Sequence, residues 1–182
     1  LAEVSSGGGS IAWIDPGGSL KAGPHSAGAL PGPVAYGKGG TLPTVTDANV
    51  VLGYLNPVAL LDGGLAIDHD GAVAAIERHI GDPLGLTASE AAARVIEVVN
   101  ANMVEALNIV SVERGHDPQE FVMIAFGGAG PIHAMALASE LGIPRVIIPP
   151  APGAFSALGL VATDLKRDYS RTLYAELASV EL

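Results

Sequence analysis

The stretch Phe121-Val122-Met123-Ile124-Ala125-Phe126-Gly127-Gly128-Ala129-Gly130-Pro131 decides the fold class of this chain. Its first six residues form a short apolar run, which is typical of a β-strand buried on both faces of a sheet. The glycines then predict a turn, and Pro131 suits the first turn of a helix that we expect to extend to about Leu141. A strand, a glycine turn and a helix in this order predict an α/β fold class.

The same alternation continues toward the C-terminus. We expect a second strand over 145–148, a turn over 149–153, a helix over about 154–161 and a last strand over about 167–174. Residues 119–182 are therefore the α/β segment of the chain.

Upstream of this unit, residues 46–118 are predicted to be mainly helical. Thr87-Ala88-Ser89-Glu90 is a capping box, in which the Thr hydroxyl and the Glu carboxylate each satisfy a free backbone amide. A long helix follows it, with Gly115 as the expected C-cap. Its apolar positions recur at intervals of three and four residues: Val95, Val99, Met103, Ala106 and Val110.

Two shorter helices are expected before it. One runs from a cap at Thr46-Asp47 to about Leu55, and one starts at Asp68 or Asp70 and ends at Gly81. Residues 1–45 are rich in glycine and proline, and we expect a hairpin there, with a strand over 11–14, a Pro-Gly-Gly turn and a return strand.

Composition narrows the class of protein. The chain has 182 residues, of which 49% are apolar and 15% charged, so one packed domain is expected. The net charge of −10 offers no basic stripe for nucleic acid or for an anionic membrane. Cysteine is absent, which excludes disulfides and Cys-ligated zinc. No apolar run reaches about 18 residues, so no membrane span is expected.

The N-terminus carries no leader pattern, and a cytoplasmic location is therefore expected. The abrupt start at Leu1, shortly before a glycine run, suggests a piece of a longer protein.

The turn Gly127-Gly128-Ala129-Gly130 is the first candidate binding site. A helix N-terminus has unpaired amides, and glycines let a ligand approach the backbone, as in many nucleotide sites. The turn has neither the Walker A pattern nor the Gly-x-Gly-x-x-Gly spacing, so a plain structural turn is an equal alternative. His133 follows in the first turn of the helix, where it either orients a ligand or is an ordinary polar residue near a helix start.

Two other patterns qualify as candidates. Gly7-Gly8-Gly9-Ser10 is either an anion cradle or a flexible hairpin entry. Asp47 lies in an oxygen-rich cluster with Thr44, Thr46 and Asn49. It could hold a hydrated magnesium ion or orient a water molecule, but a helix cap is the more economical interpretation. No histidine pair has zinc-helix spacing, and no structural metal is predicted.

Five segments of the sequence, here called blocks, resemble the hydantoinase A/5-oxoprolinase family and occur in the same order as in that family. Within the family, the chain is similar to the central part of an N-methylhydantoinase A-like protein. The resemblance covers nearly the whole chain. The blocks are Gly7–Trp13; Ser26–Asn49; Asn100–Met103 with Val110–Pro118; Phe126–Ala134; and Pro152-Gly153 with Ser156–Gly159.

This resemblance implies the second lobe of an actin/hexokinase-like ATPase fold, with a mixed sheet and packed helices. The turn formed by Gly127, Gly128, Ala129 and Gly130 then matches the adenosine-binding loop of that fold. Gly7, Gly8, Gly9 and Asp47 would lie near the cleft, and Asp47 and His133 are the candidate catalytic residues.

The family implies an ATP- and Mg²⁺-dependent hydrolase that opens hydantoin or 5-oxoproline-type rings. ATP would phosphorylate the ring carbonyl oxygen, which makes a poor electrophile reactive. A hydantoinase B-type subunit or fused domain is the implied partner. Two alternatives remain: a subunit of an ATP-dependent ketone carboxylase of the acetone type, and a non-catalytic nucleotide-binding or scaffold domain.

The chain departs from the family pattern in several ways. It lacks both Asp-Gly-Gly-Thr-type phosphate loops and the C-terminal extension, so the isolated piece is expected to be inactive. Asn108 stands where many members have Arg, and Leu30 stands where an acidic residue is common.

Overall fold

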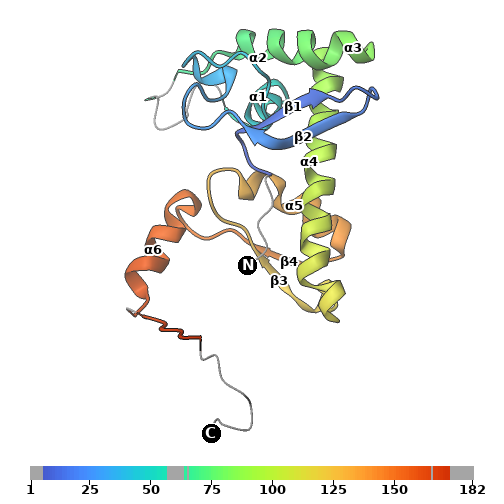
Figure 1. Cartoon of the computed structure of the whole chain (residues 1–182). Coiled ribbons are helices and arrows are strands. Elements are labelled where there is room, and N and C mark those ends of the chain that lie inside the picture. The colour runs from blue at the N-terminus through green and yellow to red at the C-terminus, as the bar shows by residue number, and fades with distance from the viewer. Residues whose placement is uncertain (1–5, 57–63, 65, 165, 173–182) are drawn as a thin grey trace, which may run out of the picture.

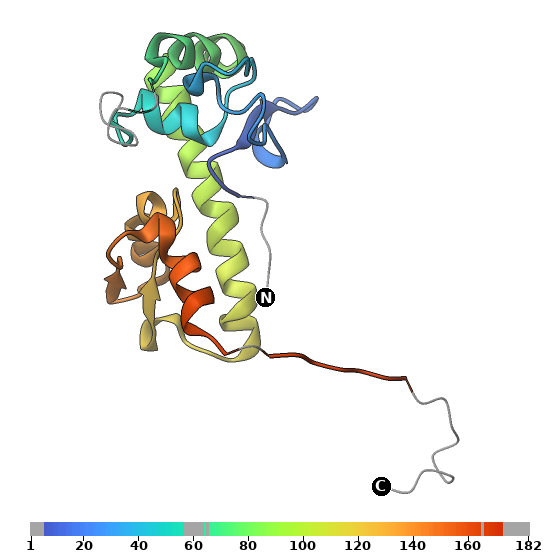
Figure 2. The ribbon, with the colours of Figure 1, turned by 90° about the vertical axis from the view of Figure 1, so that its left-hand side faces the viewer.

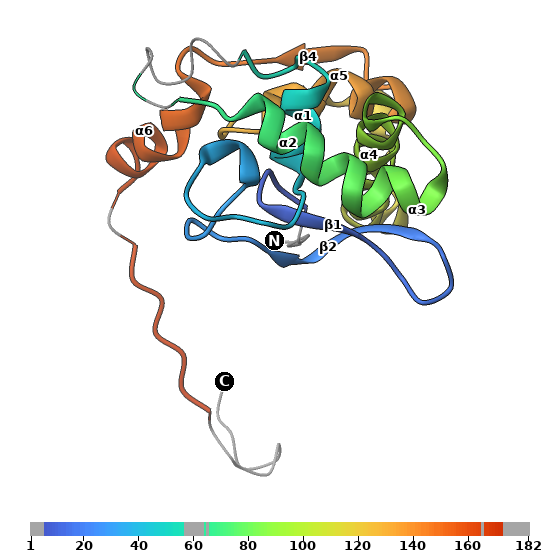
Figure 3. The ribbon, with the colours of Figure 1, turned by 90° about the horizontal axis from the view of Figure 1, so that it is seen from above.

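A long helix, α4 (Ala88–Val110), runs through the structure and joins two groups of elements (Figures 1 and 2). The computed structural model describes residues 6–56, 64, 66–164 and 166–172. Around the N-terminal half of α4 lie β1 (Ser10–Ile14), β2 (Leu20–Ser26), α1 (Val45–Val51), α2 (His69–Ile76) and α3 (Asp82–Leu84). Beside its C-terminal half lie α5 (Gly130–Leu141) and the strands β3 (Val122–Ile124) and β4 (Arg145–Ile147), whereas α6 (Phe155–Ala162) lies away from α4 (Figures 1 and 3).

The N-terminal hairpin is confirmed. β1 and β2 pair antiparallel, with Ile14 opposite Leu20. Asp15 stabilises the connecting turn, because its Oδ1 accepts hydrogen bonds from the backbone N–H groups of Gly17 and Ser19, both at 2.9 Å.

The first expected helix is shorter than predicted and begins earlier. Its N-cap is Thr44 rather than the Thr46-Asp47 pair, and Asp47 is the N3 residue of a capping box. The helix ends at Val51, because Gly53 has a φ of 73° and turns the chain out of the helix.

The second expected helix is confirmed at its start, where Asp68 caps α2 and accepts a hydrogen bond from Gly71 N–H. Gly81 does not end it. The chain continues through a π-helical segment, Glu77–Gly81, into α3. The C-cap is Gly85, whose φ of 66° is the left-handed conformation that glycine adopts at little cost.

The core lies where α4 meets the hairpin, α1 and the π-helical segment (Figure 3). The capping box of Thr87 and Glu90 is confirmed, and the hydroxyl of Thr87 lowers the pKa of the Glu90 carboxyl. Gly115 does not cap α4, which ends at Val110; it caps the 3₁₀ turn Val112–Arg114 instead. The buried core residues are mostly small: Ala12, Ala22, Val45, Ala48, Ile76, Ile80, Ala91, Ala92, Val95 and Val99.

By length and composition alone, the segment Ala88–Arg114 could cross a membrane, with a mean hydropathy of 1.4. The charged residues Arg94, Glu97 and Glu105 interrupt this segment, so it contains no continuous apolar run of about 18 residues. The N-terminal half of α4 is packed in the protein core, and Arg94 and Glu97 form an exposed ion pair on its outer side at 2.7 Å. We therefore interpret the N-terminal half of α4 as a core helix of the fold, whereas only 11% of the apolar window as a whole is buried.

The C-terminal α/β unit is confirmed in outline. β3 and β4 form a parallel pair, with Met123 opposite Val146, and α5 connects them. The mixed α/β class is thus confirmed, although the described strands lie in two separate two-stranded sheets. The expected last strand is wrong over 167–172, which pair with no other strand; residues 173–174 lie outside the described residues.

Candidate functional site

The two glycine loops lie next to each other. A Cβ placed on Gly8 would be 4.0 Å from the Cβ of Ala129, although these residues are far apart in the sequence. A cavity of about 510 Å³ opens between the loops. The cavity is lined by both glycine loops, by the segment 28–38 and by residues of α1 and α5. The lining residues are Gly8, Gly9, Gly28, Pro33, Tyr36, Lys38, Thr46, Asn49, Leu55, Gly128, Ala129 and Ile132.

The loop from Gly127 to Gly130 is fixed by a backbone hydrogen bond at its first residue, and its other glycines have open space around them. Gly127 has a φ of 87° and donates its N–H to the carbonyl of Pro152 at 2.8 Å. Ala129 is the N-cap of α5, and no side chain caps the helix. A Cβ on Gly128 or Gly130 would meet no atom within 4 Å. In the first turn of α5, Pro131 has no N–H and Ile132 N donates to the carbonyl of Ala129 at 3.0 Å. The amides left for an anionic or polar ligand are therefore those of the loop itself, from Gly128 to Gly130.

The loop containing Gly7, Gly8 and Gly9 is held by its carbonyls. The carbonyl of Gly8 accepts hydrogen bonds from Thr46 N at 2.8 Å and from Thr46 Oγ1 at 2.9 Å. The carbonyl of Gly9 accepts a bond from Ala27 N. The loop is thus tied to the N-terminus of α1 and to the end of β2, so the hairpin entry is ordered.

Asp47 is fully buried and its carboxylate is occupied by donors of the chain. It accepts hydrogen bonds from Ala35 N at 2.7 Å, Thr44 N at 2.7 Å, Thr44 Oγ1 at 2.8 Å and Val34 N at 3.3 Å. The helix-cap interpretation is confirmed. A catalytic or magnesium-binding role stays a prediction, and this donor set does not fit it, since a carboxylate offers about four acceptor positions. Within the described ranges, no cluster of three or more His, Asp or Glu side chains could hold a metal ion.

Asn49, one turn later in α1, is the unusual residue of the cavity wall. It is 1% exposed, and its Oδ1 has no hydrogen-bond partner. The sequence placed Asn49 in an oxygen-rich cluster but gave it no role. It gave none to Tyr36 and Lys38 either, although both lie in the block Ser26–Asn49 that resembles the family.

His133 is buried behind the loop rather than at its surface, and it does not line the cavity. Its Nδ1 lies 2.8 Å from Oδ1 of Asn100 on α4, and its Nε2 has no partner. Since an amide oxygen only accepts, Nδ1 carries the proton of the neutral ring. Burial lowers the pKa of His133. Its predicted catalytic role remains untested; its contact connects α5 to α4.

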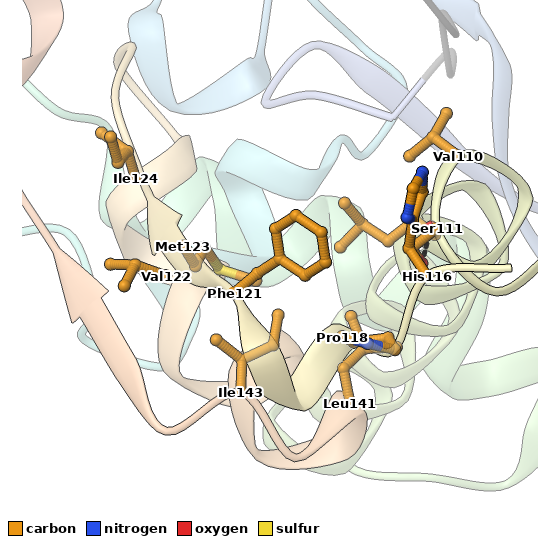
Figure 4. A pocket seen from close by; sticks show the side chains of 11 residues that line it. Val110, Ser111, His116, Pro118, Phe121, Val122, Met123, Ile124, Leu141 and Ile143 are labelled. Carbon is orange, nitrogen blue, oxygen red and sulfur yellow. Dashed lines mark hydrogen bonds between the residues drawn. The ribbon is translucent and has the colours of Figure 1, made fainter. Parts of the chain in front are cut away.

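A second cavity, of about 440 Å³, lies next to the C-terminal end of α4, whose Val110 is part of its lining (Figure 4). Its lining is mostly apolar and includes Phe121, Leu141 and Ile143, and the ring of His116 packs edge-on against Phe121. Few of its groups suit polar chemistry, so the cavity between the glycine loops is the better candidate site.

The sequence model of the Hydantoinase/oxoprolinase family matches residues 1–169. The chain belongs to this family. Two curated relatives indicate the range of its members. Caprolactamase subunit alpha of Pseudomonas jessenii is 47% identical over 93% of this chain and 24% of its own length. The acetophenone carboxylase gamma subunit of Aromatoleum aromaticum is 45% identical over 93% of this chain and 23% of its own length.

Solved structures agree with this placement. The fold matches a nucleotide-free structure of acetone carboxylase, from work on ATP-dependent acetone carboxylation, with a TM-score of 0.83 and 39% identity, over 88% of this chain and 23% of that one. It also matches the ATP-dependent caprolactamase of P. jessenii, with a TM-score of 0.79 and 48% identity over 87% of this chain and 23% of that one. The chain spans about a quarter of the length of these relatives.

Proposed function

We propose that this chain forms the adenosine side of the ATP site in an ATP-dependent enzyme subunit that opens cyclic amides. One observation carries the proposal: an accessible helix N-terminus, Gly127 to Gly130, faces the loop of Gly8 and Gly9 across a cavity whose wall holds an unpartnered buried amide oxygen. Such a cavity combines polar groups for orientation with the apolar surface of Tyr36, Leu55 and Ile132, as small-ligand sites commonly do.

In this proposal, the amides of Gly128 and Ala129 bind the polar edge of the nucleoside. The exposed Lys38 on the cavity wall favours a negatively charged ligand. Bound ATP supplies the phosphoryl group that makes an amide carbonyl reactive toward water. The part of this chain is to position the nucleotide, and positioning is itself a large part of catalysis in such reactions.

The activity of the whole protein is also a proposal, because the chain spans only about a quarter of its relatives. We infer that the phosphate-binding loops, the Mg²⁺ site and a hydantoinase B-type partner subunit or fused domain belong to the rest of such an assembly. The second lobe of an actin-like ATPase and a cytoplasmic location remain part of the same proposal.

A ketone carboxylase subunit is the second candidate. Its support is specific: the acetophenone carboxylase gamma subunit is 45% identical, almost as similar as the caprolactamase subunit at 47%. ATP hydrolysis by the assembled enzyme distinguishes the two candidates. Stimulation by a lactam supports the cyclic-amide hydrolase, and stimulation by a ketone with bicarbonate supports the ketone carboxylase. ATP hydrolysis stimulated by neither would favour a scaffold.

A calorimetric titration of the chain with Mg²⁺-ATP and with adenosine tests the proposal, repeated on Gly128→Val. Gly128 has no positive φ, and its Cβ position is open, so the valine is expected to fold normally and to obstruct only the ligand. Gly159→Val in α6 is the matched control, since its Cβ position is also open. We expect binding by the wild type and by the control and loss of binding in Gly128→Val. No binding by the wild type, or equal binding by all three, would contradict the proposal.

A further inference from the structure

The unpartnered oxygen of Asn49 is the strongest unexplained feature of the site. A buried amide oxygen without a hydrogen bond costs free energy, and native structures contain few such groups. Asn49 is 1% exposed, yet it lines the cavity between the glycine loops. Because Oδ1 itself has almost no exposed surface, it becomes satisfied when the amide turns toward the cavity and meets an N–H donor of a ligand there.

The backbone at Asn49 is held by hydrogen bonds on both sides of the residue. Asn49 is in α1, two residues after Asp47, whose carboxylate fixes the first turn of the helix to the 34–36 segment. The carbonyl of Asn49 accepts hydrogen bonds from Tyr54 N at 2.9 Å and Leu55 N at 3.3 Å. The backbone that carries the acceptor is therefore fixed, while Oδ1 itself has no hydrogen bond within the chain to hold it.

The surroundings of Asn49 suit a flat ring. Tyr36, Leu55 and Ile132 provide apolar surface in the same cavity, and Gly128 and Ala129 provide backbone on another wall. A planar heterocycle can lie on such a surface and present an amino group at its edge to Oδ1 of Asn49.

We propose that Asn49 determines the base specificity of this site, with its Oδ1 accepting a hydrogen bond from the 6-amino group of adenine. This inference depends on the proposed function, in which the Gly128–Ala129 loop binds adenosine. A purine with a 6-oxo group would place an oxygen against Oδ1, so two acceptors would face each other. Sites built to hydrogen-bond one polar group reject ligands that lack it.

The test compares three nucleosides on the 182-residue chain by calorimetry: adenosine, inosine with a 6-oxo group, and purine riboside with only hydrogen at this position. The wild type is expected to bind adenosine about tenfold more tightly than either analogue, the effect of one such bond. Asn49→Leu should reduce this ratio to about one. Asn49→Asp, which keeps an acceptor oxygen, should retain a preference for adenosine.

Asn102→Leu is the matched control. Asn102 is on α4, outside this cavity, and its Nδ2 donates to the carbonyl of Ala22 at 3.4 Å. This variant should keep the wild-type ratio. Circular dichroism checks that each variant is folded, and if Asn49→Leu is not, the wild type and Asn49→Asp still decide the outcome.

The possible outcomes separate the two proposals. Equal binding of adenosine and purine riboside by the wild type overturns the role of Asn49 and leaves the nucleoside site intact. An unchanged ratio in Asn49→Leu does the same. If the binding of caprolactam depends on Asn49 and the binding of nucleosides does not, then Oδ1 of Asn49 contacts the amide substrate and the inference is wrong. Failure of the wild type to bind any nucleoside contradicts the proposed function itself.

Discussion

The carboxylate of Asp47 lies 2.7 Å from the backbone nitrogen of Ala35 and accepts its hydrogen bond, although twelve residues separate them. This bond attaches the first turn of α1 to the segment that contains Tyr36 and Lys38. Asn49, on the same helix, and Tyr36, on the same segment, both line the cavity between the glycine loops. One buried carboxylate thus sets the relative position of two walls of the candidate site.

Asp47→Ala is expected to destabilise the fold strongly. It would leave the N–H groups of Val34, Ala35 and Thr44 without their acceptor in a buried environment. Each unsatisfied buried donor costs about 1–3 kcal/mol, so we expect a loss of about 3 kcal/mol or more in the free energy of unfolding. Urea unfolding measures it.

Asp70→Ala is the control for that experiment, because Asp70 is exposed and its only described ion pair is with the neighbouring His69. Its effect should stay within about 0.5 kcal/mol. Equal stability of the Asp47 and Asp70 variants would show that the buried capping box does not hold the loop.

Gly40→Ala should also destabilise the chain. A Cβ on Gly40 would clash with the backbone carbonyl oxygen of Gly32 and would lie 3.1 Å from the carbonyl oxygen of Pro33. Backbone atoms cannot move aside as a flexible side chain can, so a cost of about 1–3 kcal/mol is expected. Gly128→Ala, with nothing within 4 Å of its Cβ, should leave the thermal midpoint nearly unchanged. A lower thermal midpoint for Gly128→Ala than for Gly40→Ala would contradict the close approach of Gly40 to the backbone of Gly32 and Pro33.

His133 should make stability depend on pH. Burial lowers its pKa in the folded protein, so the unfolded chain binds the proton more tightly. Stability is therefore complete above the ordinary pKa of about 6.5 and falls as the pH decreases below it, with a slope of at most about 1.4 kcal/mol per pH unit. The physical reason is that a protonated ring would bury a second N–H, at Nε2, which has no acceptor.

Urea unfolding between pH 7.5 and pH 5 measures this slope. His133→Phe should reduce it, whereas His69→Ala should not, because His69 is exposed. An identical slope in wild type and His133→Phe would mean that other groups govern the acid sensitivity.

Local patterns predicted the elements that depend on local chemistry. The capping box at Thr87, the hairpin around Asp15 and the strand before Gly127 all have their causes within a few neighbouring residues. Two errors have different causes. The capping box of Thr44 and Asp47 is as local as that of Thr87, and it was missed because the neighbouring Thr46 also fits the pattern of a cap. The sequence predicts that Gly81 ends its helix, but the chain continues through it in a helical conformation into α3.

The site was predicted only in part. The sequence identified both glycine loops, but only the fold places Gly8 beside Ala129. Asn49 was noticed as one oxygen-bearing residue among several. Its relevance depends on burial and on a missing hydrogen-bond partner, which are properties of the packed structure.

The central claim is that the cavity between the glycine loops binds adenosine, and amide chemical shifts of the ¹⁵N-labelled chain test it most directly. On addition of adenosine, we predict shifts concentrated at Gly8, Gly9, Lys38, Gly128 and Ala129. The amides around the apolar cavity, such as those of Phe121 and Leu141, should not shift. Shifts confined to that second cavity, or none at saturating adenosine, would contradict the account.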